Sequence, residues 1–197
     1  MKEQTKFIFI SVFMTLITLW LASYVSAQNS SDAYRVDEFN TSESPVVIVE
    51  TSGGFVEIIG TDGNEVVSEM YVRQGRRYLS ASDTDLSDFD IFIEKNGDEI
   101  TVSAEQKGNR FFSMTRRTSV SFRVYVPYNA IASGRTSGGF VAASDLTNGI
   151  DLRTSGGSVT AKNISGEIAL RTSGGRIEID NLSGSIDART SGGSIEA

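Results

Sequence analysis

Short runs of alternating apolar and polar residues recur along the second half of the chain at a fixed spacing. The segment RTSGG occurs at 135–139, 153–157, 171–175 and 189–193, so successive copies are 18 residues apart. Each unit has two halves of nine residues, and each half is a turn signal followed by an alternating run such as SVTA or EIAL. Such alternation is typical of a short strand with one buried face. The constant period indicates stacked units of one kind.

Stacking the units aligns apolar residues that a single unit could not bury alone. We expect five inward-facing columns of residues 18 positions apart: Val141/Val159/Ile177/Ile195, Ile150/Ile168/Ile186, Ala143/Ala161/Ile179/Ala197, Leu152/Leu170/Ala188 and Leu146/Ile164/Leu182. The glycine pairs are expected to supply positive φ at one corner, and Asp145, Asn163 and Asn181 to line the other. The sequence therefore predicts an all-β fold, a parallel β-solenoid (a two-sheet β-helix) with 18 residues per coil.

The first half carries the same motif once, followed by a different pattern. VVIVETSGGFVEII at 46–59 predicts a strand, a corner and a strand, which would form the first coil. Within 60–130, a hairpin through Asn96-Gly97 and the alternating SVSFRVYV at 119–126 predict an antiparallel β insertion. The expected β-solenoid domain is thus 46–197, with the insertion at 60–130 and the TSGG repeats at 131–197. Phe55 and Phe140 both follow TSGG, so we expect each to be covered by the other or by the insertion.

The N-terminal residues have the pattern of an export signal. Residues 1–27 combine a basic start, an apolar run and small residues before Gln28, which predicts a cleaved signal peptide. The alternative is an uncleaved membrane anchor, because the apolar run from 7 to 24 reaches the lower limit for a transmembrane helix. Residues 28–45 are polar and predict a flexible stem. We therefore expect a location in the periplasm, at the cell surface or outside the cell.

Composition excludes several kinds of catalysis and one class of partner. The chain has no cysteine and no histidine, which excludes disulfides, thiol catalysis and the commonest general base. Residues 1–27 contain two lysines and one glutamate, so the rest has 16 basic and 24 acidic residues and a net charge of −8. That charge disfavours nucleic acid as a partner.

Metal binding and catalysis are not expected. Calcium-binding nine-residue repeats need an aspartate after the glycines, whereas here FVAA, SVTA, RIEI and SIEA follow. Carboxylates such as Glu57, Glu167, Glu178 and Asp187 are frequent, but the short regular turns provide no long loops to build a cleft around an acid pair. We therefore expect no catalytic residue, no cofactor and no metal site.

An arginine column offers the one candidate binding site. Arg135, Arg153, Arg171 and Arg189 would lie about 5 Å apart along one face. Asp151 and Asp187 precede two of them by two residues, which favours an exposed ion-pair network. The alternative is a ladder that binds an anionic polymer such as an acidic polysaccharide, with Arg153, Arg171 and Arg189 as the candidate binding residues.

These motifs together resemble those of a bacterial protein family. The export signal, the TSGG opening strand, SVSFRVYVP and tandem TSGG units with NISGEI-like halves are similar to the DUF4097 proteins over roughly 46–197. That family is related to the autotransporter-head (GIN-domain) β-solenoids. The resemblance implies a cell-envelope location and an adhesin-like role. Such chains continue for further coils, whereas this one stops at Ala197 inside a repeat. We therefore expect either a fragment of a longer chain or a last coil that pairs edge to edge or is covered by another molecule.

Three functions follow from these patterns. The first is a non-enzymatic envelope or surface protein that presents a rigid β-solenoid to a polysaccharide or an envelope protein. The second is a carbohydrate-binding or carbohydrate-active β-helix, in which Tyr71, Tyr78, Tyr125 and Tyr128 would replace the tryptophan that is missing after Trp20. The third is a membrane-anchored envelope-signalling accessory, which requires an uncleaved N-terminal helix.

Overall fold

Alternating apolar and polar residues form strands along the chain in the computed structural model, which describes residues 33–41, 44–84, 86–108 and 118–197. The predicted signal peptide lies outside these residues. The strands are β1 (Arg35–Asn40), β2 (Val46–Thr51), β3 (Val56–Thr61), β4 (Glu65–Gln74), β5 (Arg77–Leu79), β6 (Phe89–Asn96), β7 (Glu99–Gln106), β8 (Thr118–Pro127), β9 (Ile131–Thr136), β10 (Val141–Leu146), β11 (Ile150–Thr154), β12 (Val159–Thr172), β13 (Ile177–Thr190) and β14 (Ile195–Glu196).

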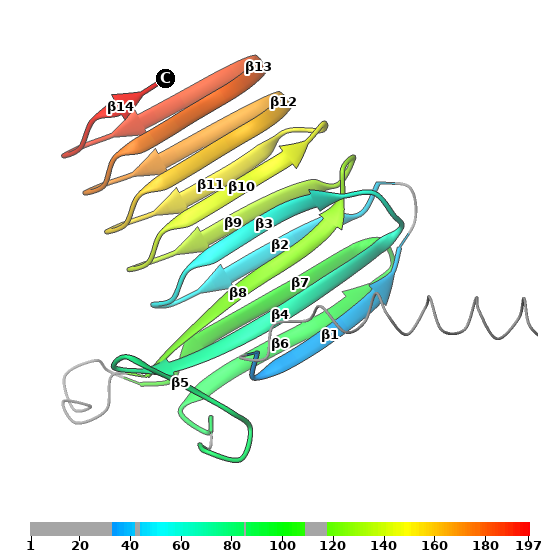
Figure 1. Ribbon diagram of the computed structural model, residues 1–197, viewed down its shortest axis with the longest axis vertical. Coiled ribbons are helices and arrows are strands. Elements are labelled where there is room, and N and C mark those ends of the chain that lie inside the picture. The colour runs from blue at the N-terminus through cyan, green and yellow to red at the C-terminus, as the bar shows by residue number, and fades with distance from the viewer. Residues whose placement is uncertain (1–32, 42–43, 85, 109–117) are drawn as a thin grey trace, which may run out of the picture. The chain divides into compact units, whose positions relative to one another are not determined.

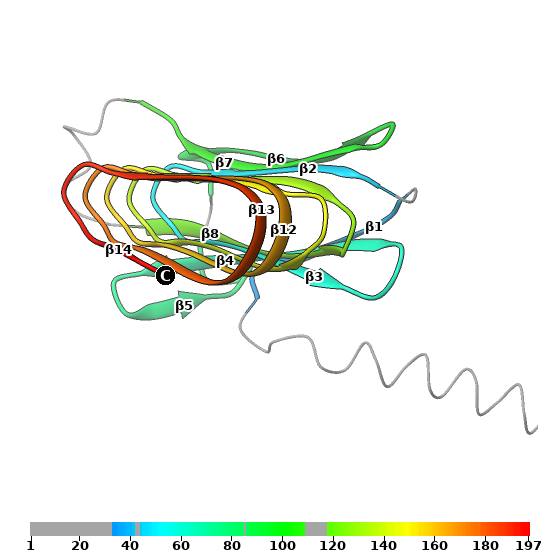
Figure 2. The same cartoon turned by 90° about the horizontal axis from the view of Figure 1, so that it is seen from above.

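The strands belong to one continuous mixed sheet, and the prediction of a two-sheet parallel β-solenoid is therefore wrong. The main order is β1-β4-β8-β3-β10-β12-β11-β9-β2-β7-β6. Antiparallel pairs join β1 to β4, β4 to β8 and β6 to β7, while the repeat strands pair in parallel. Figure 2 shows the sheet folded into two layers, with β2, β6 and β7 in one and β3, β4 and β8 in the other. The sheet is nearly closed, with β1 and β6 at the two ends of its order.

Two features separate this arrangement from the predicted one. Strands β12 and β13 run for 14 residues each and stay paired from Val159–Ile177 to Thr172–Thr190, so the second corner interrupts neither strand. The predicted insertion is also not a separate structure, because β8 pairs in parallel with β3 and β7 pairs in parallel with β2. These two parallel pairings make the first half of the chain part of the same sheet as the repeats (Figure 1).

The 18-residue register of the repeat is confirmed. Val141 pairs with Val159 and Val159 with Ile177, while Ile150 pairs with Ile168. Most of the expected columns face inward, since Val141, Val159 and Ile177 are fully buried, and so are Leu152 and Leu170. The last members do not follow: Ile186 is 45% exposed and Ile195 is 46% exposed. The register also reaches the first half, where Val56 pairs with Val141 and extends the first column. Burial of apolar area along these columns is the main source of stability for the layers.

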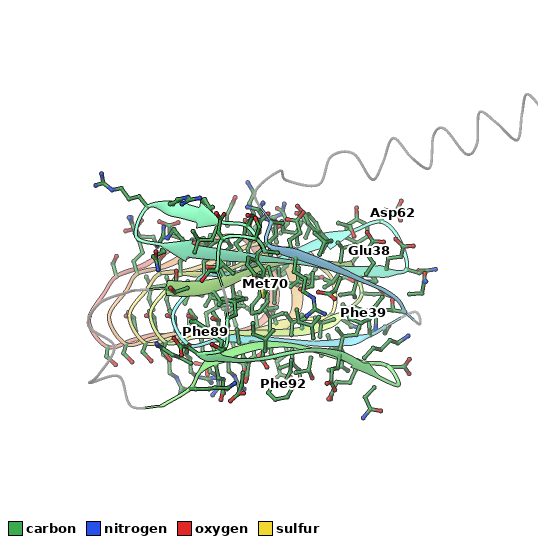
Figure 3. All side chains as sticks on the ribbon, turned by 90° about the horizontal axis from the view of Figure 1, so that it is seen from below. Glu38, Phe39, Asp62, Met70, Phe89 and Phe92 are labelled. Carbon is green, nitrogen blue, oxygen red and sulfur yellow. The ribbon has the colours of Figure 1, made fainter. Side chains whose placement is uncertain are left out.

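The core continues to the β1 and β6 ends of the sheet. Phe39, Met70 and Phe89 lie between the layers there, whereas Phe92 points away from them (Figure 3). Strand β1 falls within 28–45, where the sequence predicts a flexible stem, yet Arg35–Asn40 pairs with β4 over six residues. Pairing with β4 and the burial of Phe39 fix this segment in the sheet, although its own pattern is mostly polar.

The glycine pairs serve a different purpose from the one predicted. Positive φ occurs at the opposite corner, at Asp145, Asn163 and Asn181 and at Gly149, Gly166 and Gly184, and not in the TSGG pairs. What the second glycine of each pair provides is space, because a Cβ on Gly157 would lie 2.0 Å from the carbonyl oxygen of Gly139 in the preceding unit. A Cβ on Gly156 would meet nothing closer than 3.6 Å. Within the TSGG pair, it is therefore the second glycine that lies in close backbone contact with the neighbouring unit.

Stacked side-chain amides stabilise the corner where positive φ does occur. The Asn181 Nδ2 donates to Asn163 Oδ1 at 3.0 Å, and the Asn163 Nδ2 donates to Asp145 Oδ1 at 2.9 Å. This hydrogen bond from Asn163 is the main reason that the pKa of Asp145 lies below its usual value. Asn and Asp are the non-glycine residues that best tolerate a left-handed backbone, so the corner is satisfied both in conformation and in hydrogen bonds.

The two glycines of one corner provide a matched test. We expect Gly157→Ala to lower the free energy of unfolding by about 3 kcal/mol or more, because its Cβ would overlap a backbone oxygen that cannot move alone. Gly156→Ala should change it by less than about 0.5 kcal/mol. Urea denaturation followed by circular dichroism measures both. Equal stability of the two variants would contradict the close approach of neighbouring units.

Candidate functional site

Four arginines form a regular row on the outer face of the sheet, which we call the arginine ladder: Arg135 on β9, Arg153 on β11, Arg171 on β12 and Arg189 on β13. Each pairs in register with the next. Because Leu152 and Leu170 next to them are fully buried, alternation along the strands directs the arginines outward. The repeat thus brings together Arg153, Arg171 and Arg189, as the sequence predicts.

Carboxylates lie between the guanidinium groups. Asp151 contacts three of the arginines, at 2.8 Å to Arg153, 3.7 Å to Arg135 and 3.9 Å to Arg171. Asp187 bridges Arg171 at 2.7 Å and Arg189 at 2.9 Å. The predicted ion-pair network is therefore present. Glu178 takes no part in this network, because it pairs with Arg176 on the other layer.

Glu50 begins the row and was missed by the sequence analysis. It pairs in register with Arg135, and its Oε1 lies 3.3 Å from the Arg135 guanidinium. The signal was present, because ETSGG at 50–54 has glutamate where RTSGG at 135–139 has arginine. Among the described residues, ion pairs thus join four ladder arginines to three carboxylates, which leaves one positive charge in excess.

The ladder is exposed enough to meet a ligand. Side-chain exposure rises to 72% at Arg189. The hydrogen bond from Arg153 to Asp151, followed by the charge of Asp151, raises the pKa of Arg153, so this guanidinium stays protonated at any physiological pH. Exposed pairs of this kind add little to stability. Their partners can therefore be exchanged for ligand groups at small cost to the fold.

Two shallow grooves follow the ladder and share Arg153 and Thr154. One, of about 400 Å³, lies between Glu50, Glu105, Arg135 and Arg153. The other, of about 660 Å³, is lined by Arg153, Arg171 and Arg189 together with threonine and serine side chains, Ala188 and Ile195. All three candidate binding residues therefore line one groove.

The threonines beside the ladder are structural. The Thr172 hydroxyl donates to the carbonyl of Gly157 in the preceding unit at 2.8 Å and accepts the N–H of Gly175 at 3.2 Å. Thr154 and Thr190 make equivalent bonds. The neighbouring serines, Ser155 and Ser173, are exposed in the groove. The threonine column is therefore occupied by the fold, and the serine column is the one that a ligand can reach.

The acidic residues away from the ladder do not gather into a metal centre. Within the part of the chain that the structure describes, no three acidic side chains are grouped to hold a metal ion. No helix in the same residues is long and apolar enough to cross a membrane. Glu57, one of the carboxylates noted in the sequence, and Tyr71, one of the tyrosines of the carbohydrate alternative, both lie on the other layer, in a cluster around Arg123.

The two polar columns provide a second matched test. We expect Thr172→Val to lower the free energy of unfolding by about 1–3 kcal/mol, because a half-buried Gly157 carbonyl and the Gly175 N–H both lose their partner. Ser173→Ala, one residue away and exposed, should cost less than about 0.5 kcal/mol. Thermal or urea unfolding of both variants measures the difference, and an unchanged Thr172→Val would contradict the structural role.

Comparison with known proteins gives little for this chain. No family model matches it, so the resemblance to the DUF4097 proteins is not confirmed, and no curated protein matches it either. Among solved structures, it is similar to a "putative cell adhesion protein" from Clostridium sporogenes, with a TM-score of 0.47 and 8% identity over 82% of this chain and 97% of that one. That likeness is too distant to support a conclusion about fold or function.

Proposed function

We propose that this chain is a non-enzymatic protein of the cell envelope or cell surface with an adhesin-like role, which binds an extended anionic polymer along the arginine ladder. The observation that supports the proposal is the groove of about 660 Å³ in which Arg153, Arg171 and Arg189 lie side by side. The excess positive charge of the ladder stands out in a protein that is acidic overall.

The geometry suits a ligand with repeated acidic groups. Parallel strands place one arginine about every 4.8 Å, so several ligand groups can each meet a guanidinium. Arginine binds carboxylates and other oxyanions through two parallel hydrogen bonds, and exposed serines in the groove add further donors. Asp151 and Asp187 compete with the ligand at each position. Each contact is therefore weak, and binding depends on many contacts made together.

The same ion pairs argue against hydrolysis at this face. Asp151 and Asp187 each contact at least two guanidinium groups. General acid–base catalysis needs a side chain within hydrogen-bond reach of the reacting group, whereas both carboxylates face the ladder arginines. The ladder therefore supports binding rather than bond cleavage.

Binding to an anionic polymer is tested with polygalacturonate and its fully methyl-esterified form, which has the same backbone without the charge. We expect the double variant Arg153→Ala/Arg171→Ala to bind polygalacturonate about tenfold more weakly, because two charge-assisted contacts are lost. Binding should also weaken as salt is raised. Biolayer interferometry with the immobilised polymers measures both effects.

Arg176→Ala is the matched control, since Arg176 is also exposed and ion-paired but lies outside the ladder. An equal loss of affinity for polygalacturonate in Arg176→Ala would show that any exposed positive charge contributes to binding, and not the ladder in particular. Equal binding of the esterified polymer would contradict recognition of the carboxylates.

The proposed location is tested at the N-terminus. The leader pattern of residues 1–27 supports export, and we expect the mature protein to begin at Gln28. N-terminal sequencing of protein recovered from the envelope and from the medium reads this directly. Protein that retains residues 1–27 and sediments with membranes would instead support the anchored signalling accessory.

A further inference from the structure

Four aromatic rings form a continuous row on the layer that does not carry the arginine ladder, and we call it the aromatic row: Phe140, Phe55, Tyr71 and Tyr78. Phe140 and Phe55 stack with ring centroids 5.1 Å apart and planes 5° apart. Phe55 and Tyr71 lie 5.9 Å apart, and Tyr71 meets Tyr78 edge to face at 6.1 Å. The predicted contact between Phe55 and Phe140 is thus confirmed.

The row lies on the outer face of the sheet. Val56 and Val141, which follow Phe55 and Phe140, are fully buried in the core, so alternation turns the two phenylalanines outward. Tyr71 lies between the core residues Met70 and Val72 and is itself covered. The two ends of the row remain open, because Phe140 is 42% exposed and Tyr78 is 43% exposed.

A charged cluster is built against the row. The Arg123 Nε lies 2.7 Å from Glu57 Oε2, and its guanidinium carbon lies 5.7 Å from the centre of the Tyr71 ring. Glu69 is only 2% exposed; its Oε2 accepts a hydrogen bond from the Tyr71 hydroxyl at 2.6 Å and lies 3.9 Å from Arg123. Burial lowers the pKa of Arg123, but the hydrogen bond and the charge of Glu57 outweigh it, so the pKa is raised. The cluster is therefore fixed, with one guanidinium between two carboxylates.

The repeat itself indicates that Phe140 is not needed to build the sheet. The equivalent position in the next three units holds Ser158, Arg176 and Ser194, each just before a strand that pairs in the same register. A phenylalanine is thus used only where the row continues to Phe55 and Tyr71. Exposed aromatic rings that the fold does not require, gathered beside fixed polar groups, are the usual composition of a binding surface.

The charges of the cluster favour a neutral ligand. Glu57 and Glu69 repel an anion, and Arg123 already occupies the cation position over the Tyr71 ring. A sugar ring meets the remaining requirements, because its flat C–H face stacks on an aromatic ring while its hydroxyl groups bond to carboxylate and guanidinium. The row crosses several strands, so it can hold consecutive rings of one chain.

We propose that the aromatic row, with Arg123 and Glu57 beside it, is a second binding surface that takes a neutral polysaccharide. It is separate from the arginine ladder in both residues and chemistry, so either surface can fail its test without affecting the other. Phe140 and Tyr78 stack on the ligand, while Tyr71 and Glu69 hold Arg123 and Phe55 in position.

The test is retention of the full chain on insoluble neutral polysaccharides, with chitin, cellulose and cross-linked amylose as probes. We expect wild-type protein to be retained by at least one probe, and Phe140→Ser and Tyr78→Ala each to bind it about tenfold more weakly. Phe140→Ser uses the residue that Ser158 supplies at the next unit, so the variant should fold. Circular dichroism and the unfolding midpoint check that it does.

Two matched variants make the result specific. Phe92→Ala removes another exposed ring, 52% exposed and outside the row, and should leave retention unchanged. Phe140→Leu keeps the apolar contact with Phe55 but removes the flat face, and should bind as weakly as Phe140→Ser.

Four outcomes would overturn the proposal. They are no retention of wild type by any of the three probes, an equal loss in Phe92→Ala, full retention of Phe140→Leu, or a protein partner cross-linked to the row in place of sugar.

Discussion

The close backbone contact between successive units is the constraint on which the rest of the structure depends. At the second glycine of each TSGG corner, the neighbouring carbonyl lies where a side chain would begin, so only glycine fits. This contact, together with the threonine hydroxyl that bonds to the same carbonyl, fixes each unit against the preceding one. A one-residue slip would turn every buried residue of a strand to the outside, so the corner also determines which residues form the core.

The same fixed register creates an electrostatic problem and its solution. Aligning identical units aligns identical arginines, and four guanidinium groups at this spacing repel one another. The repulsion is relieved at a position where the units differ in sequence. In the column two residues before the arginines, Asp151 and Asp187 alternate with Ser133 and Ala169. Each acid is shared by more than one arginine, so the row tolerates its charge while keeping a positive excess.

Local patterns in the sequence were enough to predict the strands of the repeat, their register, the buried columns and the arginine ladder. They failed where contacts distant in sequence decide the outcome. The pairing of β8 with β3 and of β7 with β2 joins segments that no local pattern connects, and it turns the expected solenoid into a nearly closed mixed sheet. The pattern of β1 is too polar to predict a strand without its partner β4. The contact of Arg123 with Glu57 and Tyr71 likewise depends on which strands become neighbours.

The replacement of arginine by glutamate at Glu50 gives the ladder a direction. Its first position is acidic, and its most exposed guanidinium belongs to Arg189, four positions further along. Charge along the row therefore runs from an acidic end at β2 to a basic end at β13. If the proposed ligand is a polymer whose two ends differ, this gradient of charge would favour one of its two orientations along the row.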